Sequence, residues 1–135
     1  MLFPTALVQG TLIKRYKRFL ADVKLITGET ITAHCPNTGT MLSCSKPDSP
    51  VALSISDNPK RKYPHTLEMV MDNSTWVGVN TARTNALVKE AIESGQISEF
   101  EHPLTVKSEI KTSAHTRLDL QVINNTSSIF VEVKN

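Results

Sequence analysis

Short runs of alternating apolar and polar residues fill the first 78 positions of this 135-residue chain. Proline, glycine and asparagine separate the runs, a pattern typical of short strands joined by turns. The strand-like segments are residues 11–14, 19–25, 30–33, 51–56, 67–71 and 76–79. Several short strands at this spacing predict an all-β barrel of the OB-fold type, which is a common platform for nucleic acids.

The pattern changes near Asn80, where apolar residues begin to recur at helical spacing. Residues 85–94 carry four apolar side chains on one side of a predicted helix, and Gly95 is suited to end that helix. The four side chains are those of Leu87, Val88, Ala91 and Ile92. This segment is therefore expected to cover a core with one face.

Three strand patterns follow the helix, after a predicted loop over residues 97–105. The patterns cover residues 106–111, 117–123 and 129–134. A helix followed by three strands differs from the all-β order that precedes it. We therefore expect two domains, an all-β OB-like barrel over residues 1–78 and an α/β unit over residues 79–135.

The last two strand patterns are expected to pair as a hairpin, because the polar residues 124–128 between them favour a turn. A two-residue turn centred on Asn125-Thr126 places Asp119 opposite Glu132. In that register one face is apolar, with Leu118, Leu120, Val122, Ile129, Val131 and Val133. The other face carries Arg117, Asp119, Glu132 and Lys134.

The predicted polar face has the composition of a metal site. Two carboxylates directly across a strand pair repel each other, and a bound divalent cation would remove that cost. Oxygen ligands suit Mg²⁺, which usually takes one or two carboxylates and keeps water elsewhere. Lys134 would face the same point, where it could orient an attacking water or neutralise phosphate charge. A solvated hairpin face with ordinary cross-strand ion pairs remains an open alternative.

Composition and charge add a candidate nucleic-acid surface. Hydrophobic content of 39% and charged content of 21% are values of a globular protein. The net charge is only +2, but the basic residues are grouped. One cluster is Lys14, Arg15, Lys17 and Arg18, interleaved with Tyr16 and Phe19, and the other is Lys60, Arg61 and Lys62, followed by Tyr63. Such clusters attract polyanions, and the aromatic rings could stack on bases, although a charge run can also be a plain solvated face.

Cysteine usage and the first residues bear on location. Cys35 and Cys44 do not form a Cys-x-x-Cys pair, so reduced thiols in a cytoplasmic protein are expected. Residues 1–7 are few and include Pro4, which argues against a signal peptide or a membrane span. We expect no membrane partner.

Several stretches of the chain resemble one known family in order and spacing. They are residues 15–23 (RYKRFLADV), 34–39 (HCPNTG), 56–66 (SDNPKRKYPHT), 79–81 (VNT), 108–111 (SEIK), 117–119 (RLD) and 131–134 (VEVK), together with Asn85-x-Leu87 and Glu90-Ala91. Over essentially its whole length the chain resembles the sugar fermentation stimulation protein A family. That resemblance implies a DNA-binding protein linked to the regulation of sugar utilisation.

The resemblance also implies a fold and a site. The fold would be an N-terminal OB-like barrel followed by a partial α/β unit of the PD-(D/E)xK nuclease type. In such nucleases a helix glutamate, a strand aspartate and a Glu-x-Lys strand build the catalytic site. Those roles fall here on Glu90, Asp119, Glu132 and Lys134, with Mg²⁺ or Mn²⁺ held by Asp119 and Glu132. Members of the family extend past the Glu-x-Lys strand, so the resemblance implies a C-terminally truncated nuclease-like unit.

Three functions remain open from the sequence. The first is DNA binding with little sequence preference, through the basic clusters of the barrel. The second is a Mg²⁺-dependent DNA endonuclease. The third is a regulator with a vestigial site that acts through a protein partner. DNA is the expected partner in the first two, and the sequence leaves the formation of homo-oligomers open.

Overall fold

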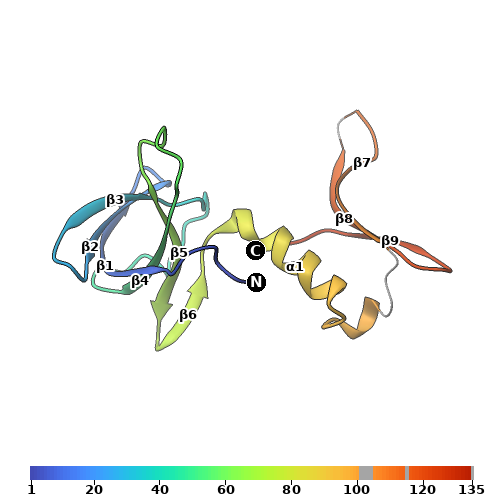
Figure 1. Ribbon diagram of the computed structural model, residues 1–135, viewed down its shortest axis with the longest axis horizontal. Coiled ribbons are helices and arrows are strands. Elements are labelled where there is room, and N and C mark those ends of the chain that lie inside the picture. Colours follow the sequence, from blue (N-terminus) through green and yellow to red (C-terminus); the bar gives the residue numbers. More distant parts are fainter. Residues whose placement is uncertain (101–104, 115, 135) are drawn as a thin grey trace. The chain divides into compact units, whose positions relative to one another are not determined.

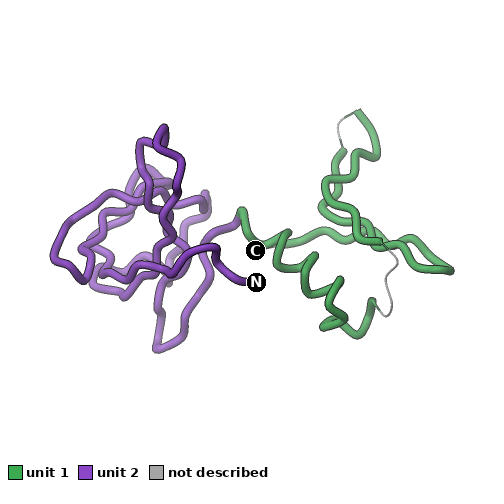
Figure 2. Tube along the Cα trace, in the orientation of Figure 1, with its two compact units in different colours: residues 1, 82–135 green, residues 2–81 purple. Residues whose placement is uncertain are grey.

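The computed structural model describes residues 1–100, 105–114 and 116–134 (Figure 1). The chain forms two compact units (Figure 2). One unit comprises residues 2–81, and the other comprises Met1 with residues 82–135. Each unit has its own hydrophobic core, so each is considered by itself.

The first unit is a β-barrel with one additional strand. Its strands are β1 (Val8–Tyr16), β2 (Leu20–Leu25), β3 (Thr30–His34), β4 (Pro50–Ile55), β5 (His65–Asp72) and β6 (Thr75–Gly78). The sheet order is β3-β2-β1-β4-β5-β6, and a further pairing of β3 with β5 closes the first five strands. This closed order is that of an OB-like barrel, which confirms the fold predicted for the N-terminal half.

The barrel closes through a single parallel pair between β3 and β5, His34 with Thr66. All its other strand pairings are antiparallel. We call the pair His34–Thr66 the seam. The loop of residues 35–40 begins directly after the seam on one strand, and the loop of residues 56–64 ends directly before it on the other. Closure therefore makes the two strands that carry these loops neighbours in the barrel.

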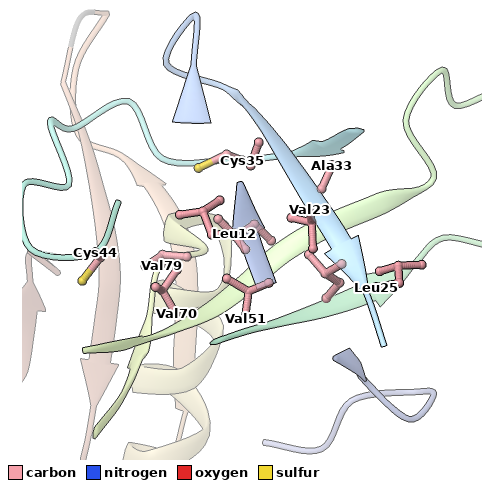
Figure 3. Packing of buried hydrophobic residues seen from close by; sticks show 12 residues of the cluster. Leu12, Val23, Leu25, Ala33, Cys35, Cys44, Val51, Val70 and Val79 are labelled. Carbon is pink, nitrogen blue, oxygen red and sulfur yellow. The ribbon is translucent and has the colours of Figure 1, made fainter. Parts of the chain in front are cut away.

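The core of the barrel follows from the alternation along its strands. The inward positions are apolar and buried, and nine of them are labelled in Figure 3: Leu12, Val23, Leu25, Ala33, Cys35, Cys44, Val51, Val70 and Val79. Each fully buried leucine or valine side chain among them contributes about 1.5–3 kcal/mol relative to an exposed one. Both cysteines are buried here as free thiols.

Gly10 marks the place where β1 lies closest to β2. A Cβ atom there would lie 2.6 Å from Val23 Cγ1 and 2.8 Å from the carbonyl oxygen of Lys24. The second contact is with backbone and cannot yield to a side-chain rotation. The position therefore requires glycine for the strands to approach this closely.

The second unit consists of a helix and a three-stranded sheet. Its elements are α1 (Thr84–Glu93), η2 (Ser98–Phe100), β7 (Thr105–Lys111), β8 (Arg117–Ile123) and β9 (Ser128–Val131), and η1 (Thr81–Arg83) begins at the last residue of the first unit. The strands are antiparallel in the order β7-β8-β9. The predicted loop of residues 97–105 contains η2, and its residues 101–104 lie outside the described residues.

The helix covers one face of this sheet. Ile92 of α1 packs with Leu120 and Val122 of β8, and Val88 joins the same cluster. Gly95 ends the helix with a φ of +69°, as predicted. Leu87 was expected on the buried face, but it is 48% exposed. The apolar stripe is narrower than predicted, because the contacts follow the i, i+4 spacing of Val88 and Ile92 and leave Leu87 at its margin.

None of the helices in the described part of the chain is both long and apolar enough to cross a membrane.

Candidate functional site

The β8–β9 hairpin has the predicted register. Leu120 pairs with Val131, and Val122 pairs with Ile129. At the turn, the Asn124 Oδ1 atom accepts hydrogen bonds from the backbone N–H groups of Thr126, at 3.0 Å, and Ser127, at 2.7 Å. This side chain closes the turn as an Asx turn does, and the turn is centred on residues 125 and 126.

The second strand of the hairpin ends earlier than predicted. Its ladder stops at Val131 rather than continuing to Lys134. Beyond that point a side chain replaces the backbone partner, because the Val133 N–H donates to Asp119 Oδ2 at 2.8 Å. The Asp119 carboxylate therefore keeps the Glu-Val-Lys segment beside β8 without regular strand pairing.

Three of the four predicted site residues meet at this end of the hairpin. The Lys134 Nζ atom donates to Glu132 Oε1 at 2.6 Å. The hydrogen bond to Glu132 and the negative charge of Glu132 raise the pKa of Lys134 above its ordinary value. Partial burial opposes this shift, and the charge of Asp119 adds to it. Lys134 therefore lies in the electrostatic field of both carboxylates and carries a positive charge at neutral pH.

Glu90 lies on α1 and has a different partner. Its carboxylate is 2.7 Å from the N-terminal ammonium of Met1, and its side chain is 55% exposed. Among residues 1–100, 105–114 and 116–134, no three His, Cys, Asp or Glu side chains are grouped so as to hold a metal ion. The structure therefore brings Asp119, Glu132 and Lys134 together but does not bring Glu90 to them.

Asn85 is a neighbour of this site that the residue pattern did not reveal. Its Nδ2 atom donates to Asp119 Oδ1 at 2.9 Å, from the first turn of α1. The contact spans 34 positions in the sequence and depends on how the helix packs on the sheet. Only the resemblance pointed to this residue, through the Asn85-x-Leu87 motif.

Glu109 is a second neighbour missed from the sequence. Ser108 pairs with Leu120 and Ile110 pairs with Leu118, so Glu109 occupies the position opposite Asp119 on β7. Its φ of +56° lies in the left-handed region, which is uncommon for a residue other than glycine. Its carboxylate forms an ion pair with Arg117 at 3.0 Å. Extending the strand register to β7 would have placed this residue from sequence alone.

The donor set at Asp119 and Glu132 suits a small divalent cation. Each carboxylate oxygen has two acceptor positions, and one hydrogen bond occupies only one of them. Two carboxylates with water in the remaining positions match the usual protein contribution to a Mg²⁺ site. When bound, such a cation would supply Lewis-acid polarisation of a phosphate oxygen and a more acidic water.

In the first basic cluster of the barrel, Arg15 forms hydrogen bonds within the fold. The guanidinium of Arg15 donates from one nitrogen to the carbonyl oxygens of Arg18 at 2.5 Å, Asn37 at 2.7 Å and Gly39 at 2.9 Å. Arg15 therefore holds the loop of residues 37–40 against the end of β1. Lys17 and Arg18 are exposed, and both adopt positive φ where the chain turns into β2.

The second basic cluster lies in the loop that precedes β5. The Asn58 Oδ1 atom accepts from the Lys60 N–H at 3.0 Å, which shapes the loop. Arg61 donates to Thr66 Oγ1 at 3.2 Å, so its guanidinium contacts the seam. Lys62 places its Nζ atom 5.4 Å from the ring centroid of Tyr63, a cation–π distance.

Each basic cluster contains one tyrosine, Tyr16 in the first and Tyr63 in the second. The Tyr16 hydroxyl donates to Asp22 Oδ1 at 2.9 Å. A hydrogen bond with Thr32 lowers the pKa of Tyr16, but the hydrogen bond to Asp22, desolvation and the negative charge of Asp22 outweigh it, so the net shift is upward.

The fold places the chain in a class of proteins that combine an N-terminal OB-like barrel with a C-terminal unit made of a helix and an antiparallel sheet. Residues 13–79 match the model of the SfsA N-terminal OB domain. Residues 82–135 match the model of the sugar fermentation stimulation protein RE domain. The chain belongs to the sugar fermentation stimulation protein (SfsA) family, as its motifs predicted.

Known relatives are similar over the whole chain. The sugar fermentation stimulation protein homolog of Desulfotalea psychrophila is 56% identical over 133 residues, which cover 98% of this chain and 56% of the relative. The homolog of Geobacter sulfurreducens is 46% identical over 135 residues, covering 100% of this chain and 58% of the relative. The chain thus spans somewhat more than half the length of these relatives.

A solved structure has the same fold. The structure of Pyrococcus furiosus SfsA in complex with Ca²⁺ superposes with a TM-score of 0.83 at 22% sequence identity. The match covers 99% of this chain and 56% of that protein. It supports an SfsA-like arrangement of elements within the second unit as well as the barrel.

Proposed function

We propose that the barrel binds DNA with little sequence preference, in a protein linked to the regulation of sugar utilisation. The observations that support this proposal are the exposed basic side chains of both clusters and the lysine ammonium groups beside the rings of Tyr16 and Tyr63. Lys14, Lys17, Arg18, Lys60 and Lys62 supply exposed positive charge, while Arg15 and Arg61 shape the loops that present it. Phosphate contacts of this kind carry no sequence information.

The tyrosines add a way to hold unpaired bases. Lys14 Nζ lies 5.2 Å from the Tyr16 ring centroid and Lys62 Nζ lies 5.4 Å from the Tyr63 ring centroid, so each ring has a cation beside it. A base stacked on such a ring contributes about 1–3 kcal/mol, whatever its identity. The surface is therefore suited to single-stranded regions as well as to the duplex backbone.

For the second unit we propose a divalent cation, Mg²⁺ or Mn²⁺, held by Asp119 and Glu132. The oxygen donors and their proximity support this assignment. The related Pyrococcus furiosus protein, which shares the fold, was solved with Ca²⁺, a cation that also prefers oxygen ligands. The unit would then be a PD-(D/E)xK nuclease-like domain carrying its cation on the hairpin.

A metal-dependent DNA endonuclease is the second candidate, favoured by the position of Lys134. Its ammonium is charged at neutral pH and bonded to Glu132, where it can orient water or neutralise developing phosphate charge. A regulator with a vestigial site is the third candidate. It is favoured by Glu90, whose carboxylate is engaged by the N-terminal ammonium rather than by the hairpin. We place all three functions in the cytoplasm.

DNA binding is tested by fluorescence anisotropy with labelled single- and double-stranded oligonucleotides over a range of salt concentrations. The Lys60→Ala, Arg61→Ala, Lys62→Ala variant should bind every sequence more weakly, and its salt slope should fall by roughly one unit per lost contact. The charge-matched control is Lys24→Ala, Lys107→Ala, Lys111→Ala, which removes three exposed lysines outside the clusters. Equal losses in the two variants would reduce the effect to net charge and remove the cluster from the site.

Cleavage is tested separately on supercoiled plasmid and on single-stranded DNA, with Mg²⁺, Mn²⁺ or a chelator. An endonuclease requires cleavage that depends on the cation and disappears in Lys134→Ala. Cation binding without cleavage would favour the binding function or the vestigial site.

A further inference from the structure

Asn85 occupies an unusual place in its helix. It is the second residue of α1, and the side chain of the N-cap residue Arg83 forms no capping hydrogen bond. Asparagine is a favourable N-cap residue but a poor interior helix former. The position therefore contributes little to the helix itself. Its amide is used instead for a tertiary contact with Asp119 at 2.9 Å.

The direction of this hydrogen bond is fixed by chemistry. An ionised carboxylate only accepts hydrogen bonds, so the amide of Asn85 must present its Nδ2 group to Asp119 Oδ1. The other oxygen, Oδ2, accepts the Val133 N–H at 2.8 Å. One carboxylate thus joins α1 to the segment that follows β9, and its plane is fixed by a donor on each side.

This arrangement sets the geometry of the proposed cation site. Val133 lies between Glu132 and Lys134, and residues two apart in an extended chain point to the same face. Anchoring the Val133 N–H therefore orients both neighbouring side chains, whose heads are 2.6 Å apart. The amide of Asn85 leaves the second acceptor position of Oδ1 open for a cation.

We propose that Asn85 is a positioning residue, which fixes the Asp119 carboxylate and, through it, the Glu132-Val133-Lys134 segment for cation binding. The part that concerns the cation depends on the proposed function, whereas the part that concerns Val133 does not. Outer residues that orient metal ligands typically change metal affinity or activity by 10–100-fold when substituted. No contact between Asn85 and the cation is required.

The test uses the whole 135-residue chain with two measurements. Hydrogen exchange by NMR follows the Val133 amide without metal, and titration calorimetry measures Mn²⁺ affinity. Asn85→Ala should speed exchange at Val133 by about tenfold or more and weaken Mn²⁺ binding by about 10–100-fold. Exchange at Ile129, which pairs with Val122 in the ladder, should stay unchanged. Asn125→Ala, an asparagine of the same hairpin that is exposed in the turn, is the matched control.

A second variant separates positioning from folding. Asn85→Asp keeps the shape but replaces the donor with a negative charge, so Asp119 is repelled. Exchange at Val133 should rise without metal and fall again when Mn²⁺ is added, because the cation offsets the repulsion.

Each outcome decides one part of the question. Unchanged exchange at Val133 in both Asn85 variants overturns the proposal. Faster exchange that extends equally to Ile129 also overturns it, because Asn85 would then support the whole unit rather than the site. Faster exchange confined to Val133, in a protein that binds no Mn²⁺, supports positioning and rejects the proposed cation instead.

Discussion

The two units of this chain differ in how completely their strands enclose a hydrophobic core. The barrel closes on itself, and twelve buried residues form its core cluster. In its described residues, the second unit is an open three-stranded sheet under α1, with a core cluster of four buried residues. Its hairpin leaves Ile129 37% exposed and Phe130 51% exposed. The proposed binding surface is thus carried by a closed framework, whereas the proposed cation site depends on individual side-chain bonds.

That contrast has a consequence for local stability. Segments with few buried contacts open at lower free energy than core strands. In the second unit, the bonds from Asn85 and Val133 to Asp119 take over where the β8–β9 ladder ends. Cation binding should therefore order this part of the chain, while the barrel should be indifferent to it.

The largest expected effect comes from the barrel core. Leu53 is fully buried, and Leu53→Ala should lower the free energy of unfolding of the barrel by about 2–5 kcal/mol. Leu42→Ala is the control, because Leu42 is 84% exposed and its truncation should cost less than about 0.5 kcal/mol. Urea unfolding followed by Trp76 fluorescence measures both. Similar urea midpoints for the two variants would contradict the expectation that the buried Leu53 side chain contributes more to barrel stability than the exposed Leu42 side chain.

The second effect concerns the cation and should be confined to the other unit. At a Mn²⁺ concentration of 100 times Kd, linkage stabilises the binding unit by about 2.7 kcal/mol. Asp119→Asn should abolish this gain and leave most DNA binding intact, because the barrel carries it. Hydrogen exchange with and without Mn²⁺ measures the gain unit by unit. A gain that survives in the Asp119→Asn, Glu132→Gln double variant would place the cation elsewhere.

The third effect distinguishes shape from charge within the barrel surface. Arg15→Lys keeps the charge but loses the planar guanidinium that reaches several carbonyl groups. We expect a loss of about 1–2 kcal/mol in stability, because charged hydrogen bonds to the loop disappear. DNA affinity should also fall as the loop of residues 37–40 loosens. Lys17→Arg, which changes the head group at an exposed position of the same cluster, should alter neither.

The smallest effect is a pH dependence at Lys134. Its pKa is raised in the folded protein, so its pairing with Glu132 favours folding at pH values below the ordinary lysine pKa of 10.5. That contribution is lost as the pH rises through the folded-state pKa. Lys134→Met should therefore be less stable than wild type at pH 8, and the difference should vanish at higher alkaline pH. Melting temperatures at pH 8 and above pH 11, at low salt, give the comparison. A difference that persists would assign the effect to packing of the side chain.

Much of the fold was predictable because it follows from residue alternation. The apolar positions of β8 and β9, such as buried Leu120 and partly buried Val131, have period two, and that period fixed the hairpin register. The end of β9 was not predictable, since a side chain of Asp119 replaces the ladder there. Helix packing decides the Asn85 contact, and an unusual φ decides the conformation of Glu109. Neither has a local sequence signal.

The basic clusters illustrate a similar limit. Their positions in the sequence predicted an electropositive surface, but did not predict which arginines form hydrogen bonds within the protein. Arg15 binds loop carbonyls, and Arg61 binds Thr66, so both act within the fold as well as on its surface. A charge pattern indicates where cations are and does not indicate which of them the fold already uses.

The single parallel pair at the seam has a consequence for folding kinetics. Strands that follow each other in sequence can pair early, as β1 with β2, β2 with β3 and β4 with β5 do. Pairing of His34 with Thr66 requires a chain closure of about 30 residues, whose entropy makes it a late event. Only then do β3 and β5, whose adjoining loops contain the partners of Arg15 and Arg61 itself, become neighbours. We therefore expect nucleic-acid binding to appear in the last phase of refolding, after most of the strand signal in circular dichroism has already returned.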